Sequence, residues 1–294
     1  MPIYDYSGNL ELKFCNIHKQ IDYFKDSNFA NPDHNVTWAD PIGTVMLKAH
    51  SELYKVPLDK IPTNGYITKM MTQGIDSQSS SYSTYTPIAL IQGRFHTEKI
   101  RDSLTATIMK NFAGLSPINQ DDLKKYLNHM FSELMNNVSD HSHSDIGGYA
   151  MAQYYPQHKK VQFAIADKGC GFLENIQAKY PNITTEEDAI LKAMERAVTA
   201  SKNIVYGQTR NMGYGLYTLE TILNATHGKM IIISNDKMMK LENGKKSVLD
   251  LSTNWEGVVV AFEFLEEHTE YEFETIQRRW LEEGSEEEEE DFFL

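Results

Sequence analysis

The sequence predicts an α/β fold in which a mixed β-sheet carries helices on one of its faces. Two observations support this prediction. Short apolar segments typical of strands alternate with longer amphipathic segments typical of helices between about residues 88 and 264, as expected for helices layered on a sheet. One of the strand-like segments, residues 160–167, is almost entirely apolar, which indicates a strand that is buried on both faces.

The N-terminal part of the chain, residues 1–80, is expected to form a smaller α/β module. Its clearest pattern is a strand, a turn and a helix within residues 34–54. Asp40 is expected to cap this helix, and Pro41 to occupy the first helical position, where its missing N–H is tolerated. Residues 72–87 are rich in Ser, Thr and Tyr, which predicts a linker that contains the domain boundary.

The larger domain is expected to span residues 81–264. Its expected strands are 87–92, 148–156, 160–167, 229–236, 247–252 and 257–265, and its expected helices are 97–112, 119–142, 185–200 and 214–228. Residues 237–247 are expected to form a hairpin-like connection. Gly228 is expected to end the last helix in the C′ position.

The negative charge of the chain is concentrated in its last thirty residues. The net charge is −13, and residues 265–294 hold thirteen acidic residues and two arginines, which leaves −2 for the rest. We expect this acidic tail to be disordered, and the near-neutral body has no basic groove for nucleic acid.

No signal peptide and no run of eighteen apolar residues is visible, so we expect a cytoplasmic protein without a membrane span. The two cysteines, Cys15 and Cys170, predict neither a metal cluster nor a disulfide framework, and Cys170 is expected to be only a small loop residue.

A row of polar side chains marks the helix that contains the stretch FSELMNNVSDHS. Glu133, Asn137 and His141 are spaced four residues apart, which places them along one side of a helix. Apolar residues fall mostly on the other side. A solvated helix face is the simpler explanation of this row, and a binding site is the alternative.

Glycine-rich motifs follow this helix along the chain. Asp167 ends the apolar strand and is followed by Gly169 and Gly171, and Gly213 and Gly215 lie just before a predicted helix. Each motif alone is typical of an ordinary turn. Their order and spacing after the polar helix favour a common site.

Taken together, these motifs resemble those of the GHKL superfamily of ATPases and kinases, which includes gyrase, Hsp90, histidine kinases and MutL-type proteins. Residues 133–141 match the N box, residues 167–171 the first glycine box and residues 213–216 the second. The resemblance covers about residues 100–264. It implies the Bergerat fold, an α/β sandwich that binds a nucleotide between the sheet and its helices.

The resemblance implies ATP and Mg²⁺ as cofactors. The implied cofactor-binding residues are Asn137, His141, Asp167, Gly169, Gly171, Thr209, Arg210, Gly213, Gly215 and Leu216. The chemistry fits, because a buried Asp167 can accept a hydrogen bond from the N6 amino group of adenine, where guanine has a carbonyl oxygen. Glycines let the backbone approach the nucleotide, and a helix N-terminus favours phosphate.

Glu133 is the expected catalytic residue, since a carboxylate near the γ-phosphate can orient or deprotonate the attacking group. Asn137 is the expected Mg²⁺ ligand, because this ion prefers oxygen ligands. The implied function is slow ATP hydrolysis, or transfer of the γ-phosphate, in a regulatory role. The alternative is a non-catalytic ATP sensor whose closure recruits a partner protein.

Several side chains near these motifs have two readings. His141 can donate to a phosphate, or it can interact with the dipole of the helix end. Thr209 and Arg210 can contact the phosphates or lie exposed in a loop. Lys168 and His143 are expected to be solvated loop residues.

One position departs from the family pattern. Val258 stands where these proteins often have Thr after Gly257, and that Thr helps to hold the carboxylate beside the adenine. We expect either weaker binding or compensation by a neighbouring group.

The remaining features suggest a protein partner. Residues 35–50 resemble the signature of STAS domains, the partners of anti-sigma-factor kinases, although Ile42 replaces their phosphorylatable Ser. Residues 1–80 are therefore expected to be a STAS-like interaction module, and the alternative is an unrelated extension packed on the ATPase.

The acidic tail ends in Phe292-Phe293-Leu294 and either solubilises the chain or docks on a basic pocket of a partner. A histidine-kinase role is not expected, because neither His96 nor His129 lies in a phospho-acceptor motif.

Overall fold

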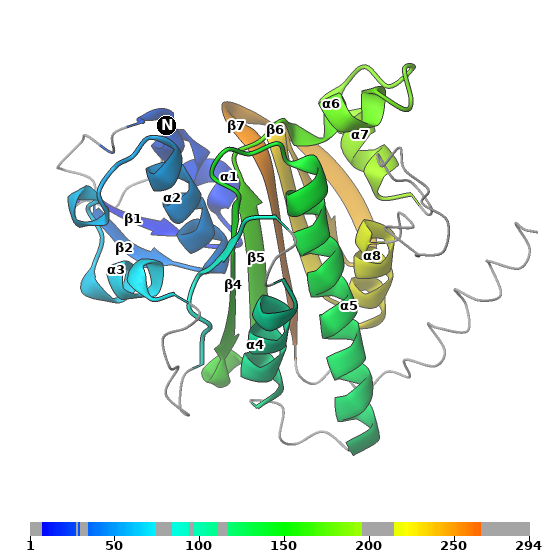
Figure 1. Cartoon of the computed structure of the whole chain (residues 1–294), viewed down its shortest axis with the longest axis horizontal. Helices are drawn as coiled ribbons and strands as arrows, with labels where there is room; N and C mark the ends of the chain where they lie inside the picture. Colours follow the sequence, from blue (N-terminus) through cyan, green and yellow to red (C-terminus); the bar gives the residue numbers. More distant parts are fainter. Residues whose placement is uncertain are drawn as a thin grey trace, which may run out of the picture.

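The computed structural model confirms a mixed α/β architecture (Figure 1). It describes residues 8–27, 29, 35–74, 84–93, 97–110, 117–195 and 215–265. A five-stranded sheet separates two hydrophobic cores: helices cover one face of the sheet, and the N-terminal segment covers the other. The expected domain boundary and the acidic tail fall on residues 75–83 and 266–294, which lie outside the described residues.

The five-stranded sheet is antiparallel rather than mixed. Its strands are β3 (Ala89–Ile91), β4 (Gly148–Tyr155), β5 (Lys160–Asp167), β6 (Lys229–Glu242) and β7 (Lys245–Leu265), in the spatial order β3-β4-β5-β7-β6. Each described neighbouring pair runs antiparallel. The expectation of a mixed sheet is therefore wrong for these strands.

β6 and β7 form one long hairpin, where the sequence predicted three shorter strands and a connection. Residues 237–247 continue the ladder up to a turn at Asn243 and Gly244 instead of leaving the sheet. Met238, Met239 and Leu241 are buried in this part of the hairpin, and their burial explains why it remains paired.

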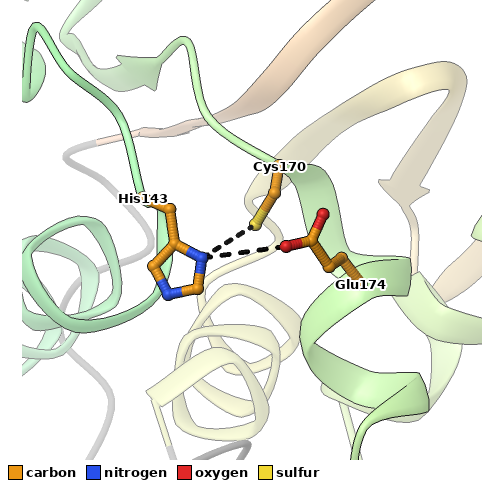
Figure 2. Close-up of side chains that lie close together, drawn as sticks. All are labelled: His143, Cys170 and Glu174. Carbon is orange, nitrogen blue, oxygen red and sulfur yellow. Dashed lines mark hydrogen bonds and ion pairs between the residues drawn. The ribbon is translucent and has the colours of Figure 1, made fainter.

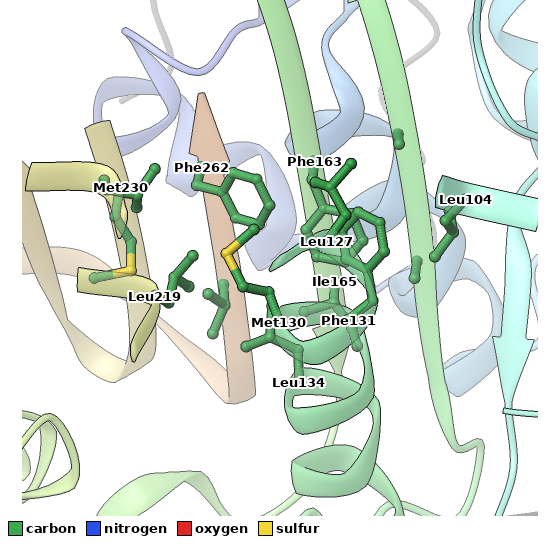
Figure 3. Packing of buried hydrophobic residues seen from close by; sticks show 14 of the residues in the cluster. Leu104, Leu127, Met130, Phe131, Leu134, Phe163, Ile165, Leu219, Met230 and Phe262 are labelled. Carbon is green, nitrogen blue, oxygen red and sulfur yellow. The ribbon is translucent and has the colours of Figure 1, made fainter. Parts of the chain in front are cut away.

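Three helices cover one face of the sheet: α4 (Thr97–Met109), α5 (Pro117–His141) and α8 (Gly215–Ala225). Figure 3 shows apolar side chains of these helices meeting those of the sheet. Phe131 of α5 stacks on Phe163 of β5 at 4.7 Å between ring centroids, and Phe163 stacks on Phe262 of β7 at 5.1 Å. This packing fixes the polar side of α5 relative to the end of β5.

The C-terminus of α8 differs from the prediction by one residue. His227, and not Gly228, has the left-handed backbone conformation of the C′ position, with φ of 49°. The Gly228 amide donates to the carbonyl oxygen of Leu223 at 2.7 Å. This is the 6→1 hydrogen bond of a Schellman motif, which spans more residues than the other bond of the motif.

The N-terminal segment packs on the opposite face of the sheet. It comprises β1 (Asn9–Leu12), α1 (Ile17–Gln20), η1 (Ile21–Lys25), β2 (Asn35–Ala39), α2 (Pro41–Leu53), η2 (Leu58–Lys60) and α3 (Gly65–Thr72), and β1 pairs with β2 in parallel. α2 contacts β4, β5 and β7, and most of its residues are buried.

Asp40 precedes α2 as predicted, with Pro41 at the first turn, but its side chain makes no capping hydrogen bond. It accepts instead from the Phe14 amide and the Trp38 indole, both at 2.9 Å, and from the Tyr155 hydroxyl at 3.0 Å. Tyr155 ends β4, so this buried carboxylate joins the N-terminal segment to the sheet.

The remaining short helices are η3 (Pro156–His158), α6 (Gly171–Gln177) and α7 (Glu186–Ala193). α6 and α7 follow β5 and pack on each other near one end of the sheet. None of the helices in the described part of the chain is both long enough and apolar enough to cross a bilayer.

Candidate functional site

A pocket lies between the polar side of α5, the end of β5, the α6–α7 pair and the start of α8. It is lined by Glu133, Leu134, Asn137, Val138, His141, Ser142, Ile165, Asp167, Gly171, Phe172, Asn175, Ile176, Ala193, Gly215, Leu216, Val258 and Val260. Its walls are thus mostly apolar, with a few polar groups from separate elements, as is typical of small-molecule sites.

Asp167 is buried at the end of β5. Its Oδ1 accepts hydrogen bonds from the amides of Gly169 at 2.9 Å and Val258 at 3.3 Å. Within the part of the chain that the structure describes, Oδ2 accepts no hydrogen bond, and the residue lines the pocket. Burial raises the pKa of this carboxyl to about 7, against the opposing effect of the two amides. The group is therefore suited to receive a hydrogen bond from a ligand.

Val258 contacts the Asp167 carboxyl group through its backbone amide. Its amide makes one of the two bonds to Asp167 Oδ1, and its side chain lines the pocket. The carboxylate is therefore held without the Thr that GHKL proteins often have at this position.

The loop after Asp167 is pressed against the end of α5. A Cβ atom on Gly169 would lie 1.8 Å from the carbonyl oxygen of Ser142, so no larger residue fits there. The Cys170 amide donates to the same carbonyl oxygen at 2.9 Å. Gly169 itself does not line the pocket, but its amide donates a hydrogen bond to Asp167, which does.

Lys168 is not the solvated loop residue that the sequence predicted. Its ammonium group lies 3.4 Å from the centroid of the Trp255 ring, and burial lowers its pKa to about 8. The Trp255 indole donates to the carbonyl oxygen of Asp167 at 3.1 Å, so this ring holds the loop at two points.

The α6–α7 pair is tied to the sheet by one buried carboxylate. Glu186 accepts hydrogen bonds from the amides of Phe172 and Leu173 at 2.9 and 3.3 Å, and also from Ser234 and Asn235 of β6. A carboxylate at the first amides of a helix satisfies donors that lack partners within the helix. Glu186 thereby fixes the start of α6 beside the pocket.

The other end of the pocket lies where α5 meets α8. A Cβ atom on Gly215 would lie 2.7 Å from the Glu133 Cβ, so the two helices touch at this point. Burial, and then the charge of Asp140, raise the pKa of Glu133. A raised pKa makes a carboxylate a stronger base. Asn137 and His141 follow Glu133 along the same pocket wall.

The structure therefore brings most of the predicted residues together. Those that line the one pocket are Glu133, Asn137, His141, Asp167, Gly171, Gly215 and Leu216. Thr209, Arg210 and Gly213 lie outside the described residues. Asn175 was not predicted: its side chain donates to the His141 carbonyl oxygen at 2.7 Å and lines the pocket. Its spacing of four residues from Gly171 on a short helix is the only signal that could have pointed to it.

A cluster of ligand-type side chains lies next to the pocket and includes two residues for which the sequence predicted no role. Cys170 and His143, which the sequence predicted to be ordinary loop residues without a metal cluster, lie close to each other and to Glu174 (Figure 2). The Cys170 sulfur is 3.8 Å from His143 Nδ1, and Glu174 Oε1 is 3.9 Å from the same nitrogen.

No protein-family model and no curated protein sequence matches the chain.

Proposed function

We propose that this chain binds Mg·ATP in the pocket and slowly turns it over, by hydrolysis or by transfer of the γ-phosphate to a partner, in a regulatory role. The observation that supports this proposal is the convergence of three motifs on one pocket. Glu133 and Asn137 come from α5, Asp167 from the end of β5 and Gly215 from the start of α8. The resemblance to GHKL proteins predicted this convergence from segments that are far apart in the sequence. The helices on one face of the sheet further support a Bergerat-type fold.

Each end of the pocket suits one part of ATP. At one end, Asp167 offers an acceptor to the adenine amino group, and the apolar walls can pack on the base. At the other end, the N-terminus of α8 favours negative charge. Asn137 supplies a side-chain oxygen of the kind that Mg²⁺ prefers, so this residue fits the ion. Glu133 would orient or deprotonate the group that attacks the phosphate.

A second candidate is the ATP sensor without chemistry. Trp255 favours it, because this ring contacts both the loop after Asp167 and Phe24 of the N-terminal segment. A nucleotide-dependent movement of the loop would therefore reach that segment. A partner protein could read the change.

Two variants test these proposals. Asp167→Asn should weaken Mg·ATP binding by roughly 10–100-fold in calorimetry, because a charge-assisted hydrogen bond is worth about 1.5–3 kcal/mol. The control Asp145→Asn alters an exposed residue and should bind like the parent. Unchanged affinity of Asp167→Asn would overturn the adenine assignment.

Glu133→Gln separates the enzyme from the sensor. The variant should keep its ATP affinity and lose about 10²–10⁴-fold in phosphate release. The exposed Glu98→Gln serves as the matched control. If the parent releases no more phosphate than Glu133→Gln, alone and with cell extract, the sensor is the better description.

A further inference from the structure

We propose that His143, Cys170 and Glu174 form a binding site for a zinc-type transition-metal ion beside the nucleotide pocket. Their ligand atoms all lie within 4.8 Å of one another. They come from three places: the turn after α5, the loop after β5, and α6. Figure 2 shows the three side chains pointing toward one common point.

The distances suit a tetrahedral ion. Zinc binds sulfur at about 2.3 Å, and nitrogen and carboxylate oxygen at about 2.0–2.2 Å. Tetrahedral angles then separate the sulfur from the nitrogen by about 3.6 Å, and the nitrogen from the oxygen by about 3.4 Å. The observed distances of 3.8 and 3.9 Å exceed these values by only a few tenths of an ångström, and the third pair, the Cys170 sulfur and the Glu174 carboxylate, lies within 4.8 Å.

The backbone holds the ligands in place before any ion binds. Gly169 and Ser142 touch, and the Cys170 amide donates to Ser142, so the two loops cannot separate without losing these contacts. His143 has a φ of 54°, in the left-handed region that is uncommon for residues other than glycine. Glu174 is one helical turn after Cys170 in sequence.

Asn175 contacts one of the proposed metal ligands, Cys170, and the loop next to it. The Asn175 side-chain amide donates to the Cys170 sulfur at 3.2 Å and to the His141 carbonyl oxygen at 2.7 Å. Hydrogen bonds of this kind orient a ligand and stabilise a thiolate in metal sites.

The exposure of the site and the chemical type of its ligands indicate which metal ion it would bind. The side chains of His143 and Glu174 are 61% and 68% exposed, so an ion can enter from solvent. Sulfur and imidazole ligands favour zinc, or cobalt as its substitute, over Mg²⁺ and Ca²⁺, which prefer oxygen. Three protein ligands leave a fourth position for water. On binding, the thiol proton passes to solvent and the sulfur–metal bond takes its place. This site is therefore distinct from the Mg²⁺ position proposed at Asn137.

The test uses the full chain, nucleotide-free and reduced. Zn²⁺ is titrated in competition with a chromophoric chelator. The parent should bind one equivalent, and Cys170→Ser should bind at least about 100-fold more weakly, because the loss even of a supporting residue typically reduces metal affinity by 10–100-fold. Cys15→Ser removes the other cysteine, which is exposed, and should match the parent.

Two further measurements exclude misfolding and adventitious binding. Glu174→Gln alters an exposed residue and should also weaken Zn²⁺ binding, whereas the exposed Glu187→Gln should not. Co²⁺ should give a thiolate-to-cobalt absorption band in the parent and in Cys15→Ser but not in Cys170→Ser. Equal Zn²⁺ affinity of the parent and Cys170→Ser, or a cobalt band that survives in Cys170→Ser, would overturn the proposal. Neither measurement depends on whether the pocket binds ATP.

Discussion

At Asp167, burial and hydrogen bonding act on the carboxyl group in opposite directions. Burial disfavours the charged form, while the amides of Gly169 and Val258 stabilise it. Burial is the larger effect, so the pKa rises to about 7 and the carboxyl is partly protonated near neutral pH. The pocket therefore holds an acidic group whose charged form destabilises the fold.

Replacing this carboxyl should change how stability depends on pH. Because the pKa in the folded protein lies above its ordinary 3.8, the stabilising contribution of Asp167 is complete below about pH 4 and is lost as pH rises through 7. Between pH 5 and pH 8, the free energy of unfolding of the parent should fall by roughly 2–3 kcal/mol relative to Asp167→Asn. Chemical denaturation at both pH values measures this difference. Asp145→Asn should follow the parent, and parallel curves for the parent and Asp167→Asn would refute the prediction.

At the residue scale, the sequence correctly placed Glu133, Asn137 and Asp167 in their helix and strand. Glu133 and Asn137 share a helix face, and Asp167 ends an apolar strand, so local periodicity was enough to find them. The contact between Cys170 and His143 was not predictable, because it depends on how closely two loops approach. That approach is set by the missing Cβ of Gly169, which becomes meaningful only in three dimensions.

At the scale of elements, Glu186 couples two short helices to the sheet. α6 has seven residues and α7 has eight, too few to be stable alone. The buried carboxylate of Glu186 satisfies the first amides of α6 and two side chains of β6 at once. The pocket wall formed by α6 therefore depends on one residue of the next helix.

Glu186→Gln should loosen this wall. The neutral amide offers one acceptor oxygen where the carboxylate offers two, so the variant should lose about 1.5–3 kcal/mol of unfolding free energy. The amides of Phe172 and Leu173 should also exchange hydrogen faster, which mass spectrometry of peptides from this region can measure. The neighbouring Glu187 is exposed, and Glu187→Gln should leave both quantities unchanged. Unaltered exchange in Glu186→Gln would show that α6 is held by other contacts.

The types of most elements were predictable, but their pairing was not. The period of the apolar residues located α5 and α8, because each has a buried face, and a nearly continuous apolar run located β5. The length of the β6–β7 hairpin was missed because residues 237–255 mix charged and apolar side chains, and their pairing depends on cross-strand partners such as Met238 and Leu249. Strand direction depends in the same way on partners that are distant in the sequence.

At the scale of the whole molecule, the sheet is covered on both faces by parts of the same chain. Alternate residues of β5 and β7 point to opposite cores: Phe163 and Phe262 face the helices, while Ala164 and Ala261 face the N-terminal segment. α2 belongs to the segment that the STAS resemblance suggested as an interaction module, but it is mostly buried in this second core. The nearly continuous apolar run at residues 41–47 was a sequence signal for such burial.

This packing predicts that the larger domain needs the N-terminal segment. Deleting residues 1–74 would expose an apolar sheet face that includes Met151, Ile231 and Ile233, and exposed patches of this kind promote association. The truncated chain should aggregate in size-exclusion chromatography or bind a hydrophobic dye.

A milder variant, Asp40→Asn, removes an acceptor from the buried link to Phe14, Trp38 and Tyr155 and should lower the free energy of unfolding by about 1–3 kcal/mol.

The exposed Asp59→Asn is the control for Asp40→Asn and should be neutral. Asp40→Asn should unfold in a single cooperative transition, because the N-terminal segment and the sheet contribute to one core. Its midpoint should be lowered equally for both parts. A truncated chain that stays monomeric, unfolds cooperatively and binds ATP like the parent would instead make the N-terminal segment a separate module. In that case the N-terminal segment would be available to a partner protein, as the STAS resemblance implies.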